Sequence, residues 1–219
     1  MYRIMLLALT ICAATGFIYG LVRFFPQKTA LYLRMIVFGV GCSMLGRLFE
    51  TLQLFVNGQL TSGFHVGMLG IVGSFLFFFT ANYGQMDSIV DDGSKQFRKY
   101  RLIGMIAPLA VIALYVVLPV VKGFSESTVV LGVQSAVIAL ASYYHLKHLI
   151  IQDVDYGLIR SIRSYNLIAL IYAYLCMAEM LVETIAFPTV CTAIVLALQC
   201  VAMLAIIPVL ERGVKKWTT

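Results

Sequence analysis

Long apolar runs separated by short polar connections dominate the chain. The runs lie at residues 4–24, 30–56, 61–85, 102–121, 127–150, 164–187 and 189–210. An α-helix needs about 20 apolar residues to cross the hydrocarbon core of a bilayer, and each run has that length. The pattern therefore predicts an all-α fold with a single domain, residues 1–219, formed by a bundle of seven transmembrane helices.

Composition places these runs in a membrane rather than in a soluble core. Of the 219 residues, 61% are hydrophobic and 12% are charged. A typical soluble domain is about half apolar and about a quarter charged. The short connections leave no room for a soluble catalytic domain. We therefore expect a protein that is integral to the cell membrane, either inner or plasma membrane, and that contacts membrane lipid.

Several classes of function lack their signatures. The net charge of +6 could suggest nucleic acid, but no basic soluble surface interleaved with aromatic residues is present, so we expect no nucleic-acid partner. The sequence has no Gly-x-Ser-x-Gly, no His-Glu-x-x-His and no phosphate-binding glycine loop. All five cysteines fall inside apolar runs, where we interpret them as packing residues. We expect no catalytic residue, no metal and no cofactor.

Basic residues indicate which helix ends face the cytoplasm, because cytoplasmic loops of membrane proteins carry the excess of Lys and Arg. Of the 16 Lys and Arg residues, Arg3 and Lys122 fall on one side and Arg47 lies within a helix. The other side collects Arg23, Lys28, Arg34, Lys95, Arg98, Lys99, Arg101, Lys147, Arg160, Arg163, Arg212, Lys215 and Lys216. We expect the N-terminus outside and the C-terminus in the cytoplasm. A cleaved signal peptide is the less favoured interpretation of the first run, since the run continues past its small residues.

The run at 164–187 is the most informative, because two carboxylates interrupt it. Glu179 and Glu183 lie one helical turn apart, and Tyr165 and Tyr172 continue their stripe along one face. A charged side chain at the centre of a membrane helix costs about 2.5–3.5 kcal/mol on insertion scales, so such residues usually face a polar interior. The face that holds Glu179 and Glu183 is therefore a candidate site.

Further polar residues are predicted at a similar depth. In the second run, Arg47, Glu50 and Gln53 recur at three-residue spacing and share a broad helical face. Helical rise places both Arg47 and Glu179 about 6 Å to the outer side of their helix midpoints. We expect a polar cavity open to the outside, with Gln53 and His65 at its mouth.

Two interpretations of these residues stay open. Arg47 and one of the three carboxylates could form a buried ion pair that only joins two helices. A ligand site is favoured by the charge count, because three carboxylates share one arginine and leave a formal excess of two negative charges. We expect Glu179 and Glu183 to be the anionic contacts of a small molecule or cation. Arg47 and Glu50 would form a pair that the ligand breaks.

Polar residues near the cytoplasmic side are interpreted as structural. His145, Lys147 and His148 end the fifth run, where an anchor at the membrane interface explains them better than a metal site with two histidines. The third connection, residues 87–101, places three aspartates beside four basic residues. We expect it to be a solvated connector with a short surface helix.

Glycine and proline predict how the helices pack and bend. Gly67, Gly70 and Gly73 recur at three-residue spacing, which would let a neighbouring helix approach closely. Pro108 is expected to bend the fourth helix. Pro188 separates the last two runs, which should form a tight antiparallel hairpin.

One stretch carries a family resemblance. Its third helix is rich in small and aromatic residues, HVGMLGIVGSFLFFFTANYGQ, and an acidic and then basic loop leads to a fourth helix with an early proline. From Leu45 to Pro108 the chain resembles the seven-helix N-terminal sensor regions of bacterial membrane histidine kinases. The resemblance implies a sensor without catalytic residues. Because ERGVKKWTT stands where a kinase domain follows in that family, either a separate partner would receive the signal or the protein has a different role.

The sequence thus predicts a non-catalytic receptor or sensor that binds a small ligand or cation in an outward-facing pocket and signals to a cytoplasmic partner. The alternative is a transporter or channel component that uses the embedded carboxylates as a proton or cation relay. That alternative requires polar residues in the inner half of the bundle, where the sequence shows few. An assembly subunit whose charges pair with another chain or a second copy, and a membrane enzyme with acid and base carboxylates, also stay open.

Overall fold

The computed structural model describes residues 2–26, 29–60, 63–87, 90–151 and 158–218, without the side chains at 85–86, 158–161 and 216–218. The described chain is helical throughout, apart from its connections. The elements are α1 (Tyr2–Phe24), α2 (Leu31–Asn57), α3 (Val66–Ala81), the π-helix η1 (Asn82–Asp87), the 3-10 helix η2 (Lys95–Phe97), α5 (Arg98–Gly104), α6 (Ile106–Lys122), α7 (Glu126–Ile150), α8 (Leu158–Thr184) and α9 (Thr189–Thr218).

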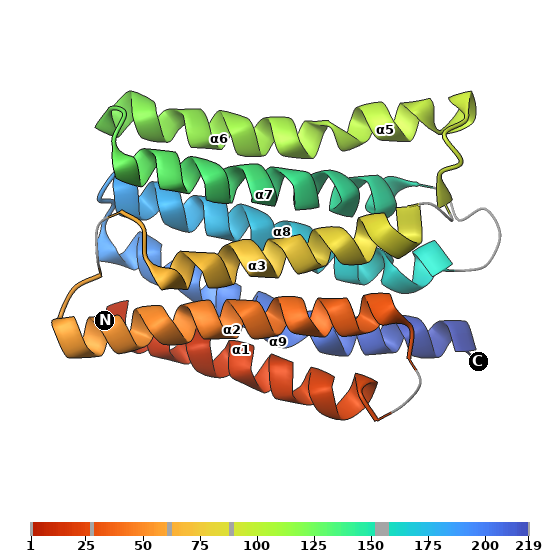
Figure 1. Ribbon diagram of the computed structural model, residues 1–219, viewed down its shortest axis with the longest axis horizontal. Helices are drawn as coiled ribbons and strands as arrows, with labels where there is room; N and C mark the ends of the chain where they lie inside the picture. The colour runs from red at the N-terminus through yellow and green to blue at the C-terminus, as the bar shows by residue number, and fades with distance from the viewer. Residues whose placement is uncertain (1, 27–28, 61–62, 88–89, 152–157, 219) are drawn as a thin grey trace.

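The long helices run side by side and form a ring. α1 packs on α2 and α9, α2 on α3, α3 on α7, α7 on α8, and α8 on α9, while α6 lies outside against α7 and α8 (Figure 1). The two termini lie at opposite ends of the bundle (Figure 1). We call these the N-terminal end and the C-terminal end. The α2–α3, α6–α7 and α8–α9 connections lie at the N-terminal end.

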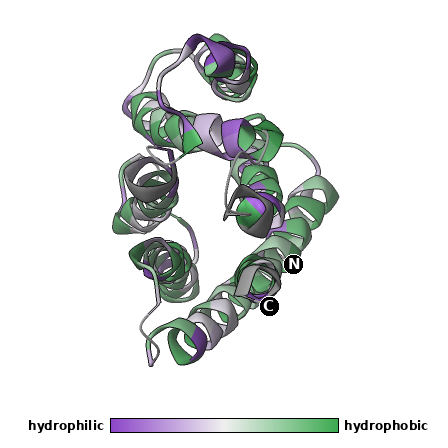
Figure 2. Cartoon of the chain, turned by 90° about the vertical axis from the view of Figure 1, so that its right-hand side faces the viewer, coloured by the Kyte–Doolittle hydropathy of each residue, from purple (hydrophilic) through white to green (hydrophobic). Residues whose placement is uncertain are grey.

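Within the described residues, seven helical spans are long and apolar enough to cross a membrane. They confirm the predicted count, and hydrophobic residues colour most of the helical surface in the view along the bundle (Figure 2). Large apolar side chains point outward, among them Val120 at 76% exposure and Val201 at 65%. Such a surface is compatible with a surrounding bilayer, where these side chains avoid water.

Element boundaries differ from the sequence prediction in three places. α3 begins at Val66 rather than 61, and α8 begins at Leu158, six residues before the apolar run. The fourth span is divided at Met105 into α5 and α6. Pro108 explains this break, because it has no N–H to donate and its ring opposes the carbonyl of Gly104.

Small residues bring α2 and α3 together, as their spacing predicted. A Cβ atom added to Gly46 would lie 2.6 Å from the Gly67 carbonyl oxygen, and one added to Gly70 would lie 2.6 Å from the carbonyl oxygen of Cys42. Real side chains do not reach such distances, so glycine is required at both positions. The close approach holds α2 in a fixed register, which positions the polar face that carries Arg47.

The predicted hairpin between the last two helices is confirmed. α8 ends at Thr184 and α9 begins at Thr189, with Pro188 between them. The two helices pack along their length. The carboxylates of α8 therefore face polar positions of α9.

One interpretation of the C-terminal end is wrong, and another is confirmed only in part. His145, Lys147 and His148 are 0%, 2% and 0% exposed, so they are buried rather than interfacial anchors. The connector at 87–101 is not fully solvated, because the side chain of Asp91 is 4% exposed. The physical reason is mutual pairing: α3, the connector and α7 enclose side chains that neutralise one another.

Candidate functional site

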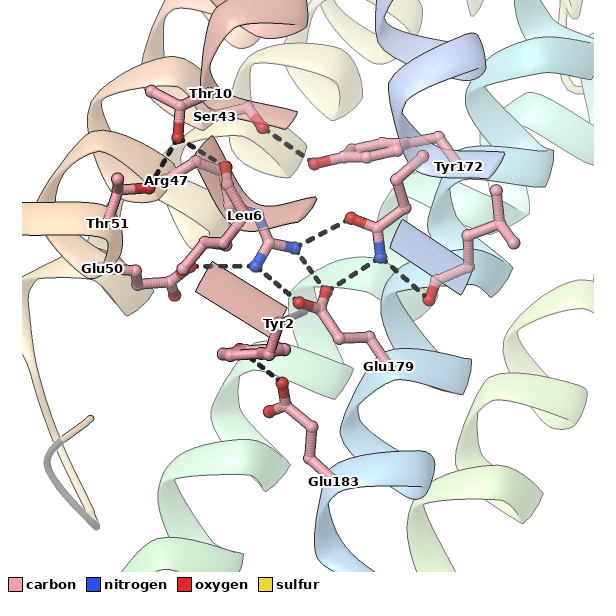
Figure 3. Close-up of polar contacts among 12 residues, drawn as sticks. Tyr2, Leu6, Thr10, Ser43, Arg47, Glu50, Thr51, Tyr172, Glu179 and Glu183 are labelled. Carbon is pink, nitrogen blue, oxygen red and sulfur yellow. Dashed lines mark hydrogen bonds and ion pairs between the residues drawn. The ribbon is translucent and has the colours of Figure 1, made fainter. Parts of the chain in front are cut away.

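Arg47 lies inside the ring and joins α2 to α8 and α9 (Figure 3). Its guanidinium donates to both carboxylate oxygens of Glu179: Nη1 lies 2.7 Å from Oε1, and Nη2 donates to Oε2. Nη1 also donates to Glu50 Oε2 at 2.9 Å, and Nη2 donates to Gln199 Oε1 at 3.0 Å. We call Arg47, Glu50, Glu179 and Gln199 the Arg47 cluster.

Gln199 completes the coordination of Glu179. Its Nε2 donates to Glu179 Oε2 at 2.8 Å and to the Leu175 carbonyl oxygen at 3.2 Å. Both oxygens of Glu179 are therefore occupied by donors from α2 and α9. The sequence predicted Glu179 as a ligand contact, but in this arrangement a ligand would have to displace Arg47 or Gln199 first.

The Arg47 cluster is shielded from solvent. Arg47, Glu50 and Glu179 are 4%, 7% and 6% exposed, and Gln199 is fully buried. The two-pronged pairing of a guanidinium with a carboxylate is the strongest common ion-pair geometry, because two parallel hydrogen bonds fix both groups. With two carboxylates and one guanidinium, the cluster has a formal charge of −1. Its main effect is to hold α2, α8 and α9 in one arrangement.

Polar contacts flank the cluster on both sides. The hydroxyls of Ser43 and Tyr172 lie 2.8 Å apart and join α2 to α8, while those of Thr10 and Thr51, also 2.8 Å apart, join α1 to α2 (Figure 3). All four residues are buried. The predicted stripe on α8 is thus present, with Tyr172 and Glu179 facing the interior.

Glu183 lies one turn beyond Glu179, and its surroundings differ. It is exposed, and its Oε1 accepts a hydrogen bond from the Tyr2 hydroxyl at 2.7 Å (Figure 3). Both residues line an open pocket of about 370 Å³ at the N-terminal end. Thr189 and Thr192 supply its other polar side chains, and the remaining lining residues are apolar. We call this the N-terminal pocket.

The backbone at the rim of the pocket has an unusual conformation. Ala186 lines the pocket and has φ of 58°, a left-handed value that non-glycine residues rarely adopt. The short α8–α9 hairpin imposes this conformation. Such departures cluster at functional sites, where the surrounding structure holds them in place.

Gln53 and His65 lie apart from the pocket lining. Gln53 is half-buried on α2, one turn beyond Glu50. His65 precedes α3, and its ring stacks on Phe49 with centroids 6.2 Å apart. Burial lowers the pKa of His65, and the positive charge of Arg47 lowers it further. The six predicted residues therefore divide among a buried ion cluster, an open pocket and a half-buried edge.

Two contributors to the site were not among the predicted residues. Gln199 is a single amide in an otherwise apolar run, and this isolated polar position could have indicated a buried polar contact. Tyr2 gave no signal, because nothing in the sequence relates the second residue to α8. Its contact with Glu183 exists only because α1 packs beside α9 and places its first turn at the pocket.

Known proteins offer no assignment for this arrangement. No protein-family model, no curated protein and no solved structure matches the chain. The resemblance of residues 45–108 to kinase sensor regions therefore stays a proposal, and function has to be argued from the geometry of the Arg47 cluster and the N-terminal pocket.

Proposed function

We propose that the protein is a non-catalytic membrane receptor that binds a small organic cation in the N-terminal pocket. The observation that supports this most directly is the state of Glu183. Its carboxylate is exposed in the pocket, and it accepts a hydrogen bond from Tyr2. Glu50 and Glu179, by contrast, are engaged by Arg47. Glu183 is therefore the carboxylate that can pair with a ligand without dismantling the Arg47 cluster.

The pocket suits an ammonium group with apolar substituents. Small-ligand sites are typically about 300–1,000 Å³ in volume with mostly apolar walls and a few polar groups, and a volume of about 370 Å³ falls in that range. Tyr2 and Phe187 provide aromatic rings, which attract cations through the negative face of the ring. The formal charge of −1 on the nearby Arg47 cluster adds a long-range preference for a positive ligand.

Orientation and signalling form part of the same proposal. We place the N-terminal pocket outside the inner or plasma membrane, because the basic residues gather at the opposite end. A cation that pairs with Glu183 competes with the Tyr2 hydroxyl, which changes how α1 and α8 are joined. α8 then carries the change to the C-terminal end, where a cytoplasmic partner or a second copy of the chain would receive it.

Thermal-shift measurements on the purified protein test the proposal. The probes are tetramethylammonium, choline and 3,3-dimethylbutan-1-ol, a neutral molecule with the shape of choline. A ligand at 100 times its dissociation constant stabilises the folded state by about 2.7 kcal/mol. We expect stabilisation by one or both cations, and none by the neutral alcohol.

Two carboxylate variants provide the matched comparison. Glu183→Gln removes the charge inside the pocket, whereas Glu126→Gln removes an exposed charge at the first turn of α7, at the same end but outside the pocket lining. The proposal expects the cation effect to disappear with Glu183→Gln and to persist with Glu126→Gln. Equal responses in both variants would contradict a role for Glu183.

A transporter or channel component is the second candidate, and one observation favours it. Asn82, His145, His148 and Asn166 are fully or almost fully buried at the C-terminal end, so polar side chains also occupy the half of the bundle opposite the pocket. Uptake of the bound cation into proteoliposomes separates the two functions. A receptor binds without flux, whereas a transporter shows flux that Glu183→Gln abolishes.

A further inference from the structure

A second cluster of charged side chains lies at the C-terminal end, far from the N-terminal pocket. Lys147 of α7 is 2% exposed, and its Nζ lies 2.6 Å from both Asp87 Oδ1 and Asp91 Oδ2. Asp87 ends the π-helix η1, a rare form of helix that is frequent at functional sites. The cluster therefore joins α7 to the segment that follows α3.

His148 is the buried titratable group of this cluster. It is 0% exposed, and its Nε2 lies 3.2 Å from Asp87 Oδ1. Burial alone would raise the pKa of Asp87, but hydrogen bonds from His148 and Lys147 outweigh it and hold that pKa below its ordinary value. Asp87 is therefore an ionised carboxylate, which can only accept hydrogen bonds. The Nε2 atom of His148 must carry a hydrogen to bond it.

The other ring nitrogen of His148 also faces an acceptor. Its Nδ1 lies 3.1 Å from Asn82 Oδ1. The amide nitrogen of Asn82 is committed elsewhere, since it donates to Asn166 Oδ1 at 3.1 Å. The amide oxygen of Asn82 thus remains to accept from His148 Nδ1. Both ring nitrogens therefore face acceptors, and only the imidazolium form can donate to both.

We infer that His148 is a proton-binding site, filled by one proton from the water at the C-terminal end. A hydronium ion of that water gives its proton to the free ring nitrogen of the neutral imidazole: one O–H bond breaks, one N–H bond forms and a water molecule remains. In the proposed orientation this water is cytoplasmic, so the protein has a second input besides its pocket. Loss of the proton removes one of the two hydrogen bonds that His148 makes to Asn82 and Asp87, and it loosens the segment after α3.

Other titratable groups around His148 set the balance of charge. Burial is the largest influence and opposes the imidazolium, because it removes the charge from water; Lys147 also opposes it, while Asp87 and Asp91 favour it. Arg101 of α5 also opposes it, but its Nε lies 3.5 Å from Asp91 and its side chain is 34% exposed, so water screens its charge. Tyr144 of α7 is a neighbouring group without formal charge, with its ring centroid 6.2 Å from that of His148.

His145 provides an internal comparison on the same helix. It is also 0% exposed, but its Nδ1 lies between Asn166 Oδ1 at 2.8 Å and the Asn82 amide nitrogen at 3.0 Å. Its Nε2 has no hydrogen-bond partner among the described residues. Among the residues that the structure describes, no carboxylate forms a hydrogen bond or ion pair with this ring. The geometry therefore keeps His145 neutral three residues from a charged His148.

Nitrogen-15 NMR of histidine-labelled protein tests this contrast directly. The chain has only three histidines, His65, His145 and His148, so the spectrum contains three imidazole groups. At neutral pH we expect one imidazolium, with two protonated ring nitrogens, and two neutral rings. Single changes His65→Gln and His145→Gln assign the signals and leave His148 in place. A wild-type spectrum without any imidazolium at neutral pH would overturn the inference, whether or not the variants fold.

A pair of aspartate variants tests the cause of the charge. Asp87→Asn removes the carboxylate that faces His148, and we expect the proton affinity of His148 to fall at least about tenfold. Asp92→Asn is the matched control, because Asp92 is exposed and accepts from the backbone N–H of Ser94 instead. An imidazolium that titrates identically in both variants would exclude Asp87 as its partner.

Discussion

Replacing Arg47 by methionine removes the cation of the Arg47 cluster and keeps an unbranched apolar side chain. Glu50 and Glu179 then remain inside the bundle with Gln199 as a neutral donor, although each had faced a guanidinium nitrogen within 3 Å. Breaking a buried ion pair from one side costs about 3–5 kcal/mol, because a buried charge loses its compensation. We expect Arg47→Met to lower the free energy of unfolding by that amount.

Replacing Glu179, the partner of Arg47, is expected to lower the free energy of unfolding by less. Glu179→Gln leaves Arg47 paired with Glu50 and keeps an oxygen that accepts from the guanidinium, so we expect a loss of about 1–3 kcal/mol. In the double variant Arg47→Met with Glu179→Gln, the strongest pair is gone from both sides. The combined loss should therefore be smaller than the sum of the single losses by at least about 1 kcal/mol.

Denaturant titration in lipid–detergent micelles, followed by circular dichroism, measures these free energies. The control is Arg23→Met, since Arg23 pairs with Glu211 at 3.4 Å but its side chain is 50% exposed. Exposed pairs contribute little, so this variant should unfold like the wild type. Strictly additive losses, or a loss for Arg47→Met no larger than that of Arg23→Met, would refute the view that the buried cluster holds the bundle together.

Further predictions concern helix packing and pH. Gly70→Ala should destabilise the protein by about 1–3 kcal/mol, because its new methyl would clash with the α2 backbone. Gly84→Ala is the control and should be nearly neutral in the same denaturant titration. The nearest neighbour of its new Cβ would be Thr80 Cγ2, at 3.9 Å. Asp87 has a lowered pKa, so it stabilises the fold above the ordinary aspartate pKa of about 3.9, and that contribution is lost as the pH falls through the folded value. The unfolding free energy of Asp87→Asn should therefore depend less on pH below about 5 than that of the wild type; identical slopes would contradict the assignment. His65 also has a lowered pKa, so below about 6.5 the unfolded state binds more protons and stability falls with the pH. His65→Gln should remove the part of this pH dependence that His65 causes. An unchanged dependence of the unfolding free energy on pH would contradict the lowered pKa of His65.

Periodicity and composition were sufficient to predict an all-α bundle with helices long and apolar enough to cross a membrane. Seven apolar runs correspond to seven spans, and the glycine spacing predicted that a neighbouring helix approaches α3 closely. The structure also places Arg47, Glu50 and Glu179 together, because charges inside apolar helices have few other ways to be neutralised. These features are local or follow from the cost of burying a charge.

Features that depend on which helices are neighbours could not be predicted in the same way. Whether Glu179 or Glu183 is available to a ligand depends on Gln199 of α9 and Tyr2 of α1, which the ring brings to α8. The polar side chains buried at the C-terminal end come from η1, the connector after it, α7 and α8. Taken one at a time, these residues match ordinary interfacial positions, so their burial was missed.

Equilibrium binding of choline to the wild type and to Glu183→Gln, measured by calorimetry in the same micelles, tests the central claim most directly. The account predicts saturable binding of choline to the wild type, affinity at least about tenfold weaker for Glu183→Gln, and no binding of 3,3-dimethylbutan-1-ol. Equal affinity of choline for both proteins, or equal binding of the neutral alcohol, would contradict recognition of a cation by Glu183 in the N-terminal pocket.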